Sequence, residues 1–176
     1  MSSEKPLHIF FDAEGTLYHP RNGKTSRDFW SNGERTVKRA KEYFELDPEV
    51  PALLRALRNR GHRLHILSRN VKDVLRPLVS HFNIGPYFDS VAIEDNKAKY
   101  LVEFKHREGL EKEHIVMIGD TWSLDVRPVQ RQGIRAILLD REGKSTVANR
   151  IGDLGDVLRL SEDALESQPP LETVCR

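Results

Sequence analysis

Short apolar runs alternate with longer segments of helical periodicity along most of the chain. The apolar runs are bounded by polar, glycine or proline residues, and they occupy residues 7–11, 63–68, 90–94, 114–120 and 135–140. Between them, apolar residues recur near helical spacing over residues 48–61, 70–82, 97–109 and 125–133. Runs of this length are typical of buried strands, and the longer periodic segments are typical of amphipathic helices. The alternation predicts an α/β fold in three layers, with an open parallel sheet covered by helices on both faces.

Three prolines refine the expected helices. Proline is tolerated in the first turn of a helix, because the first N–H groups have no partner within the helix. Pro51 and Pro128 therefore predict helix starts near Asp47 and Asp125. Pro77 falls deeper in its segment and predicts a kink there.

Residues 18–47 separate the first apolar run from the first core helix and are expected to form an insert. Asn22-Gly23 is a favoured hairpin turn, so we expect a flap followed by a short helix. Over residues 21–41 of the insert, basic residues outnumber the acids Asp28 and Glu34; they are Arg21, Lys24, Arg27, Arg35, Lys38, Arg39 and Lys41. Such a run is typical of a solvated helix face, and recognition of an anionic substrate is the alternative. Core packing is expected for the aromatic residues Phe29, Trp30, Tyr43 and Phe44.

Length and charge fit a single domain without a broad electrostatic field. For 176 residues we expect one domain over residues 1–176, with its core at about 7–160. The net charge of +1 favours neither nucleic acid nor a membrane surface as a partner. The run 7–11 is too short for a signal peptide or a membrane span, so we expect a cytoplasmic protein. The single cysteine, Cys175, excludes an internal disulfide and a zinc cluster of thiolates.

The first apolar run ends in the stretch IFFDAEGTLY, which carries two acids and a glycine. In open parallel sheets ligands bind beyond the carboxyl ends of the strands, so Asp12 at the end of this run is placed for chemistry. Alternation along an extended chain points Glu14 the same way, and Gly15 allows a sharp backbone turn. Asp and Gly after a strand are also ordinary turn residues, so the motif alone leaves a structural interpretation open.

The next strand end, RLHILSRN, offers groups that suit an anion. Ser68 ends the run, and its hydroxyl can donate to an oxyanion. Arg69 offers a cationic contact, or is a solvated residue at a helix start. Asn70 with Asp73 three residues later resembles the start of a helix.

Acids and lysines at two further strand ends indicate a metal and a phosphate. Asp120 ends its run and Asp125 follows five residues later. Carboxylates that converge without cysteine or paired histidine favour a hard cation, most simply Mg²⁺. Lys97 and Lys99 stand where a strand gives way to a helix, and one ammonium there can neutralise both a phosphate and a carboxylate. Lys97 is preferred because it precedes the helix, whereas Lys99 would lie on the helical surface.

Taken in order, DAEGT, ILS, Lys97 and GDTWSLD resemble the four motifs of the haloacid dehalogenase superfamily, most of whose members are phosphatases. The resemblance covers about residues 7–140 and implies a Rossmann-like fold. In its length and in the SRN form of the second motif, the chain is similar to the small magnesium-dependent phosphatases. The intervals between motifs are too short for a separate cap domain. The resemblance therefore implies an open site and, as partners, a phosphorylated small molecule or a phosphoprotein substrate.

The resemblance also implies a covalent mechanism. Asp12 would attack phosphorus to form an aspartyl phosphate, splitting one hard step into two. Glu14 would protonate the leaving oxygen and later activate water. Ser68 and Lys97 would hold the transferring phosphoryl oxygens, with Arg69 as a further contact.

The metal implied by the resemblance is Mg²⁺, and one of its neighbours departs from the family pattern. The ligands would be the Asp12 carboxylate, the backbone carbonyl of Glu14 and Asp120, with Asp125 close by or acting through water. Most phosphatases of the superfamily have Asp where this chain has Glu14. The added methylene changes the reach of the carboxyl by on the order of 1.5 Å, and misplacement on that scale costs about 10²-fold. The alternative is a weak or inactive relative that binds phosphorylated ligands or protein partners.

Overall fold

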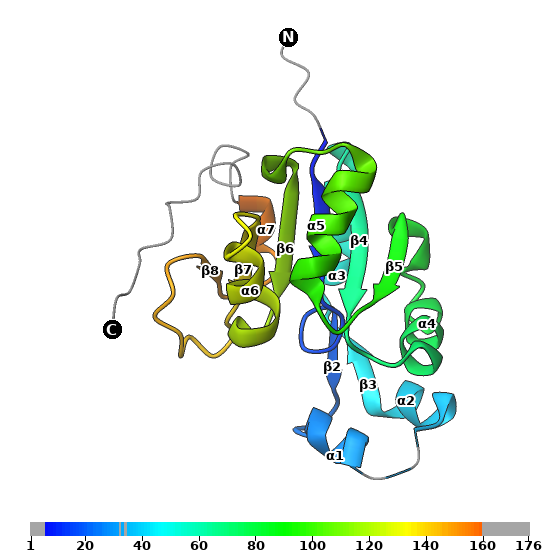
Figure 1. Cartoon of the computed structure of the whole chain (residues 1–176). Helices are drawn as coiled ribbons and strands as arrows, with labels where there is room; N and C mark the ends of the chain where they lie inside the picture. The colour runs from blue at the N-terminus through cyan, green and yellow to red at the C-terminus, as the bar shows by residue number, and fades with distance from the viewer. Residues whose placement is uncertain (1–5, 32, 34, 160–176) are drawn as a thin grey trace.

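A six-stranded sheet forms the centre of the computed structural model, which describes residues 6–31, 33 and 35–159 (Figure 1). In spatial order its strands are β5 (Ser90–Ile93), β4 (Arg63–Ser68), β1 (His8–Phe11), β6 (Ile115–Gly119), β7 (Arg135–Leu139) and β8 (Arg150–Ile151). Every pairing in this sheet is parallel. The predicted α/β fold is confirmed, and β8 is an added edge strand that no apolar run had indicated.

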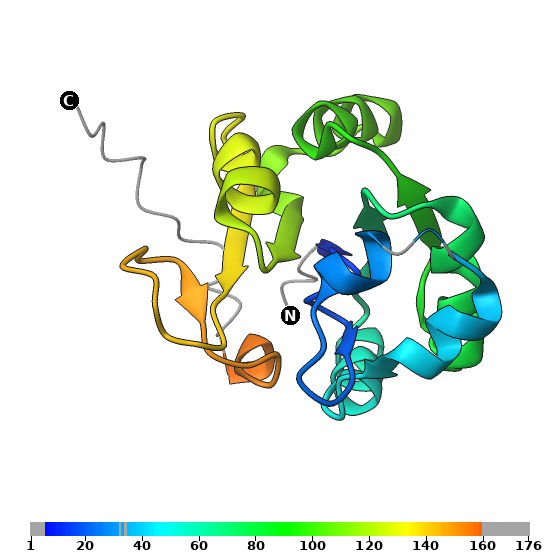
Figure 2. The same cartoon turned by 90° about the horizontal axis from the view of Figure 1, so that it is seen from below.

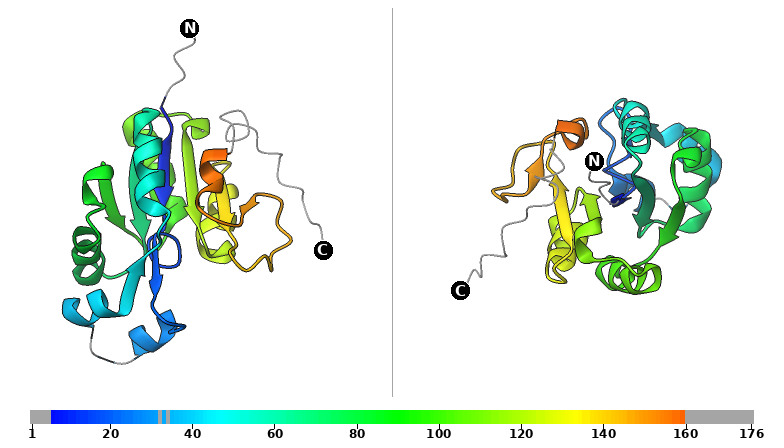
Figure 3. Two further views of the ribbon diagram at one scale, coloured as in Figure 1. Left: turned by 180° about the vertical axis from the view of Figure 1, so that it is seen from behind. Right: turned by 90° about the horizontal axis from the view of Figure 1, so that it is seen from above.

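Helices cover both faces of the sheet, as the front and back views show (Figures 1 and 3). One core cluster includes side chains of α3 (Val50–Asn59), α4 (Lys72–His81) and α7 (Asp156–Arg159). The other includes side chains of α5 (Lys97–Glu108) and α6 (Arg127–Gln130). Along β1, Ile9 and Phe11 belong to the first cluster and Phe10 to the second. Because both faces of β1 are buried, its residues from Ile9 to Phe11 are all apolar.

Short helical turns precede β5, β6 and α6. Two 3₁₀ turns, Gly85–Tyr87 and Lys112–His114, precede β5 and β6. A π-helical turn, Trp122–Val126, precedes α6. Asp125 therefore lies in this turn, and α6 begins two residues after the predicted start, because the residues up to Val126 are π-helical. Pro128 occupies the first turn of α6, as its position predicted.

The other two prolines lie within α3 and α4. Pro51 occupies the first turn of α3, as its position predicted, and the helix itself begins at Val50. Helix α4 continues past Pro77 to His81. Its start differs from the prediction, because Val71 is the capping residue and no side chain caps the helix. Asn70 is therefore not the helix cap.

The insert is more regular than the predicted flap. Strands β2 (Tyr18–Pro20) and β3 (Phe44–Leu46) pair antiparallel, and between them lie two short helices, α1 (Ser26–Ser31) and α2 (Val37–Tyr43). Asn22 and Gly23 both have positive φ, +55° and +69°, as a tight turn requires. The hairpin prediction is wrong, however, because this turn leads from β2 into α1. The strand that pairs with β2 comes after α2.

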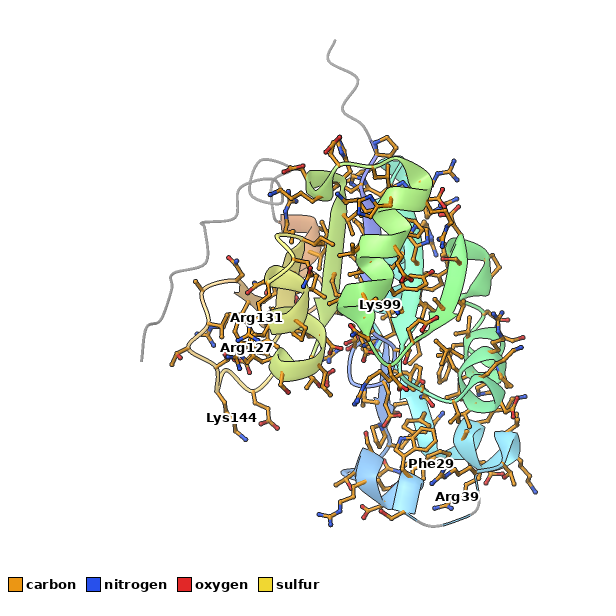
Figure 4. All side chains as sticks on the ribbon, viewed as in Figure 1. Phe29, Arg39, Lys99, Arg127, Arg131 and Lys144 are labelled. Carbon is orange, nitrogen blue, oxygen red and sulfur yellow. The ribbon has the colours of Figure 1, made fainter. Side chains whose placement is uncertain are left out.

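Aromatic side chains of the insert join the core cluster on the α3 and α4 face of the sheet. Phe29 and Phe44 are fully buried, with ring centroids 4.9 Å apart, and Tyr18 packs edge-on against Phe44. The Arg39 guanidinium lies over the Phe29 ring at 5.4 Å (Figure 4). Core packing of these aromatic residues is thus what the structure shows. The views from the front and from below place the insert beyond the carboxyl ends of the central strands (Figures 1 and 2).

Three other predictions concern membrane spans, the cysteine and the domain boundaries. Among the described residues, no helix has the length and apolar character needed to cross a membrane. Cys175 lies outside the described residues. The boundaries of a single domain over residues 1–176 stay a prediction.

Candidate active site

The carboxyl edge of the sheet carries a pocket of about 440 Å³. The seven candidate site residues predicted from the sequence all line it; they are Asp12, Glu14, Ser68, Arg69, Lys97, Asp120 and Asp125. They converge because β1, β4 and β6 are adjacent and parallel, so that the segments following these strands emerge at one edge. Asp12 still continues the sheet, since its N–H donates to the carbonyl of Ile118 at 2.8 Å.

Lys97 is the central cation of the pocket. It is the first residue of α5, its side chain is 2 % exposed, and its ammonium donates to Asp12 Oδ1 and, at 2.6 Å, to Asp125 Oδ1. Lys99 is solvent-exposed two residues further along α5 and pairs with Glu103 at 3.7 Å (Figure 4). The structure therefore brings Lys97, and not Lys99, to the acids.

Three carboxylates form a compact all-oxygen group beside this lysine. One oxygen from each of Asp12, Asp120 and Asp125 lies within 4.8 Å of the others. Burial raises the pKa of Asp12 against the opposing charge of Lys97, and the Asp125 charge adds to the rise. Asp120 is the most open to solvent of the three, yet burial of its carboxyl and the charge of Asp125 raise its pKa to about 6. Lys97 carries a single positive charge beside three carboxylates. The negative charge that remains would be neutralised by a hard divalent cation.

The π-helical turn after β6 fixes Asp125. Its Oδ2 accepts a hydrogen bond from the Thr121 N–H at 3.0 Å, while its Oδ1 accepts from Lys97. The turn folds the acid back onto the strand end, since a Cβ built on Gly119 would lie 2.5 Å from the Asp125 side chain. Because both of its oxygens are engaged, Asp125 is suited to orienting Lys97.

Gly15 explains the sharp turn that follows Asp12. Its φ of +83° is in the left-handed region, and a Cβ at this position would lie 2.1 Å from Asp120 Oδ2. The turn is closed by hydrogen bonds from Leu17 N–H to the Ala13 carbonyl at 2.7 Å and from Gly15 N–H to the Tyr18 carbonyl at 2.8 Å. A glycine is therefore required both by the backbone and by the approach of Asp120.

We expect Gly15→Ala to lower the free energy of unfolding by about 2 kcal/mol or more, because it combines a strained φ with a clash against Asp120. Gly23→Ala is the matched control, since Gly23 has a φ of +69° with nothing within 4 Å of the added Cβ. Urea denaturation of both variants measures the difference. Equal losses would show that Asp120 does not pack against Gly15 in solution.

Glu14 is held by donors from two other parts of the chain. The Trp30 indole N–H donates to Oε2 at 2.9 Å and to Oε1 at 3.2 Å. The Asn70 amide donates to Oε2 at 3.3 Å, and also to the Tyr18 hydroxyl at 2.9 Å. Burial raises the pKa of Glu14, and the hydrogen bonds from Ser26 and Trp30 oppose that rise.

The end of β4 and the residues that follow it also line the pocket. Ser68 is 2 % exposed, and its hydroxyl accepts a hydrogen bond from the Asn70 N–H at 3.1 Å. Arg69 is exposed at the pocket rim. Asn70, predicted as a helix start, instead accepts from the Val71 N–H at 2.8 Å and directs its amide to Glu14. The tertiary contact with the insert replaces the local cap.

The sequence did not point to Arg141, which holds the backbone of the turn after β1. Its guanidinium donates to the carbonyls of Gly15 and Thr16, the latter at 3.0 Å, and to Asp47 Oδ2 at 2.6 Å. Arg141 thus ties the turn after β1 to the segment before α3. The one signal in the sequence was its position, two residues after the end of β7 and therefore at the same edge of the sheet as the site.

Comparison with known families agrees with this arrangement. A family model described as haloacid dehalogenase-like hydrolase matches residues 27–133, which is more than half of the 176 residues. The chain belongs to the haloacid dehalogenase-like hydrolases. The resemblance noted in the four motifs is thereby confirmed at the level of the family.

Individual relatives are similar over part of their length. A phosphoserine phosphatase of Thermus thermophilus is 28% identical over 130 residues, which are 68% of this chain and 52% of that protein. The chain spans about half the length of the curated relatives it matches.

Solved structures share the fold over almost their whole length. The HAD phosphatase from Thermococcus onnurineus is 20% identical with a TM-score of 0.70, over 87% of this chain and 96% of that one. The putative HAD-hydrolase YfnB from Bacillus subtilis, crystallised with magnesium, is 14% identical with a TM-score of 0.69, over 89% and 98%. At these identities the likeness shows the fold alone.

Proposed function

We propose that this chain is a Mg²⁺-dependent phosphatase that hydrolyses phosphate monoesters through an aspartyl phosphate on Asp12. The observation that carries the proposal is the buried Lys97 ammonium, which contacts both Asp12 and Asp125 beside Asp120 at the carboxyl edge of the sheet. An ammonium in this place can neutralise the nucleophile and a bound phosphoryl group together. The family membership supports hydrolysis as the reaction type.

The donor set suits Mg²⁺. Asp12, Asp120 and Asp125 offer only oxygen ligands, which is the preference of this hard cation. Burial is the main cause of the raised pKa of Asp12 and of Asp120, and the charge of Asp125 adds to both rises. We assign the ligands as Asp12, the backbone carbonyl of Glu14 and Asp120, with Asp125 acting through Lys97 or through water. When bound, Mg²⁺ supplies charge neutralisation and polarises a phosphoryl oxygen.

The first half-reaction transfers the phosphoryl group to the protein. A carboxylate oxygen of Asp12 forms a bond to phosphorus as the bond from phosphorus to the ester oxygen breaks. Glu14 gives its proton to that leaving oxygen. Ser68 and Lys97 hold the phosphoryl oxygens while charge builds on them, and Arg69 contacts the substrate from the rim.

The second half-reaction releases phosphate. Glu14, now ionised, takes a proton from a water molecule, and the resulting hydroxide attacks phosphorus. The bond from phosphorus to the Asp12 oxygen breaks, so that inorganic phosphate leaves and the carboxylate is restored. Each carboxyl ends in the state in which it began.

The substrate class is a phosphorylated small molecule or a phosphoprotein, met in the cytoplasm. Support comes from the pocket mouth, where Arg69 is exposed beside Val71 and Leu124, which are 41% and 37% exposed. A mouth of this kind leaves room for groups attached to the phosphate. Nucleic acid and membranes are not proposed as partners, because the net charge is only +1.

Release of phosphate from p-nitrophenyl phosphate tests the proposal. We expect turnover with Mg²⁺ to fall by about 10²-fold or more after chelation and to return when Mg²⁺ is added back, because the lost neutralisation is worth several kcal/mol. Asp12→Asn serves as the background control. No metal-dependent turnover above that control on a panel of phosphate esters would favour a module that binds phosphorylated ligands.

A further inference from the structure

The insert reaches the active site through the side chain of Trp30 in α1. Its indole N–H donates to both carboxylate oxygens of Glu14, at 2.9 Å to Oε2 and 3.2 Å to Oε1. No motif of the sequence pointed to this contact, because Trp30 is 16 residues further along the chain. The contact falls on the residue that departs from the family pattern.

The hydrogen bonds distinguish the two oxygens of Glu14. Oε2 accepts from both Trp30 and Asn70, whereas Oε1 accepts the longer of the two bonds from Trp30. The Ser26 side chain forms a further hydrogen bond with Glu14. Glu14 has one more rotatable bond than Asp, and these donors remove that freedom.

We propose that Trp30 is a positioning residue that holds the longer Glu14 side chain where its carboxyl delivers a proton to the leaving oxygen. The added methylene moves the carboxyl by on the order of 1.5 Å, and the indole N–H fixes where it stops. This inference rests on the proposed phosphatase function. Through Trp30, the insert would position the general acid Glu14.

Trp30 is itself held in place by the insert. Its ring packs edge-on against the fully buried Phe29, with centroids 4.9 Å apart and an interplanar angle of 88°. The Arg35 guanidinium lies 5.8 Å from the indole centroid and donates to the Trp30 carbonyl at 3.2 Å. A donor fixed in this way imposes its position on Glu14 without losing further side-chain entropy.

The loss of kcat/KM caused by faulty proton delivery depends on the leaving group of the substrate. This dependence distinguishes a positioning role of Trp30 from a general loss of structure, which would lower kcat/KM on every substrate. The p-nitrophenolate ion leaves without a proton, whereas the alkoxide of glycerol 2-phosphate requires one. Because kcat/KM reports the steps through the first phosphoryl transfer, the later role of Glu14 as a base does not enter the comparison.

The experiment compares kcat/KM of Trp30→Phe with wild type on both substrates. We expect a loss of about 10²-fold on glycerol 2-phosphate and of less than about threefold on p-nitrophenyl phosphate. Tyr43→Phe is the matched control, since it removes a hydrogen bond of the same insert, from the Tyr43 hydroxyl to the Thr25 carbonyl at 3.0 Å. The control should change kcat/KM on neither substrate.

The outcomes separate this inference from the proposed function. Absence of Mg²⁺-dependent turnover in wild type overturns the phosphatase itself. Normal wild-type turnover, with an equal loss or no loss on both substrates in Trp30→Phe, overturns the positioning role alone. The positioning role is also overturned if Tyr43→Phe shows the leaving-group dependence expected of Trp30→Phe.

A spectroscopic measurement covers the case in which Trp30→Phe does not fold. The chain has two tryptophans, so ¹⁵N-labelled indole groups give two N–H resonances, with Trp122 as the internal reference. We expect Glu14→Ala to shift the Trp30 resonance upfield and to leave Trp122 nearly unchanged, because the carboxylate acceptor is lost. An unchanged Trp30 resonance would contradict the hydrogen bond and with it the inference.

Discussion

Asp12→Asn is expected to lower Mg²⁺-dependent phosphatase turnover by about 10³-fold or more. The amide has nearly the shape of the carboxyl but lacks its nucleophilic oxygen and its charge. The loss should appear on activated and unactivated esters alike, since attack on phosphorus is common to both. Initial rates on p-nitrophenyl phosphate at saturating Mg²⁺ measure it.

The same substitution should leave the fold intact. Asp12 is 8% exposed, and its backbone N–H keeps its bond to the Ile118 carbonyl in the variant. Lys97 also retains its contact with Asp125. A variant with native circular dichroism and near-normal turnover would show that Asp12 is not the nucleophile.

Lys97→Met is expected to impair both activity and stability. The ammonium is 2 % exposed and contacts Asp12 and Asp125, so its removal leaves two buried carboxylates without their cation. Breaking a buried pair in this way costs about 3–5 kcal/mol. Turnover should fall by about 10³-fold, because the charge that stabilises the phosphoryl group is lost as well.

Mg²⁺ should rescue part of the stability of Lys97→Met but little of its activity. A divalent cation neutralises the same carboxylates, so its addition should raise the Tm of the variant more than that of wild type. Lys99→Met is the matched control, since Lys99 is exposed and its ion pair is long, and it should change stability by no more than about 0.5 kcal/mol. Similar losses in both variants would contradict the central place of Lys97.

The sequence predicted which residues meet at the carboxyl edge of the sheet, because the carboxyl ends of parallel strands lie at the same edge. Once the apolar runs were taken as parallel strands, Asp12, Ser68 and Asp120 had to emerge at one edge. Lys97 could be preferred over Lys99 by its place at a helix start. These inferences needed only the order of the elements and the direction of the strands.

The insert and its contacts could not be predicted in the same way. Strand β2 is three residues long and pairs with β3 across two helices, so no local periodicity marked the pair. The turn at Asn22-Gly23 suggested a hairpin because local turn chemistry does not specify which strand pairs next. Trp30 bonds to Glu14, 16 residues away in the sequence, and Arg141 bonds to Gly15, 126 residues away. Contacts between residues so far apart in the sequence depend on tertiary packing.

The most direct test of the mechanism is to trap the phosphorylated protein. Wild-type chain mixed with p-nitrophenyl phosphate and Mg²⁺, quenched in acid and digested, should yield one phosphorylated peptide, and fragmentation in a mass spectrometer should place the phosphoryl group on Asp12. The adduct should be absent without Mg²⁺ and in Asp12→Asn. A phosphoryl group on another residue, such as Ser68, or metal-dependent turnover that persists in Asp12→Asn, would contradict the mechanism.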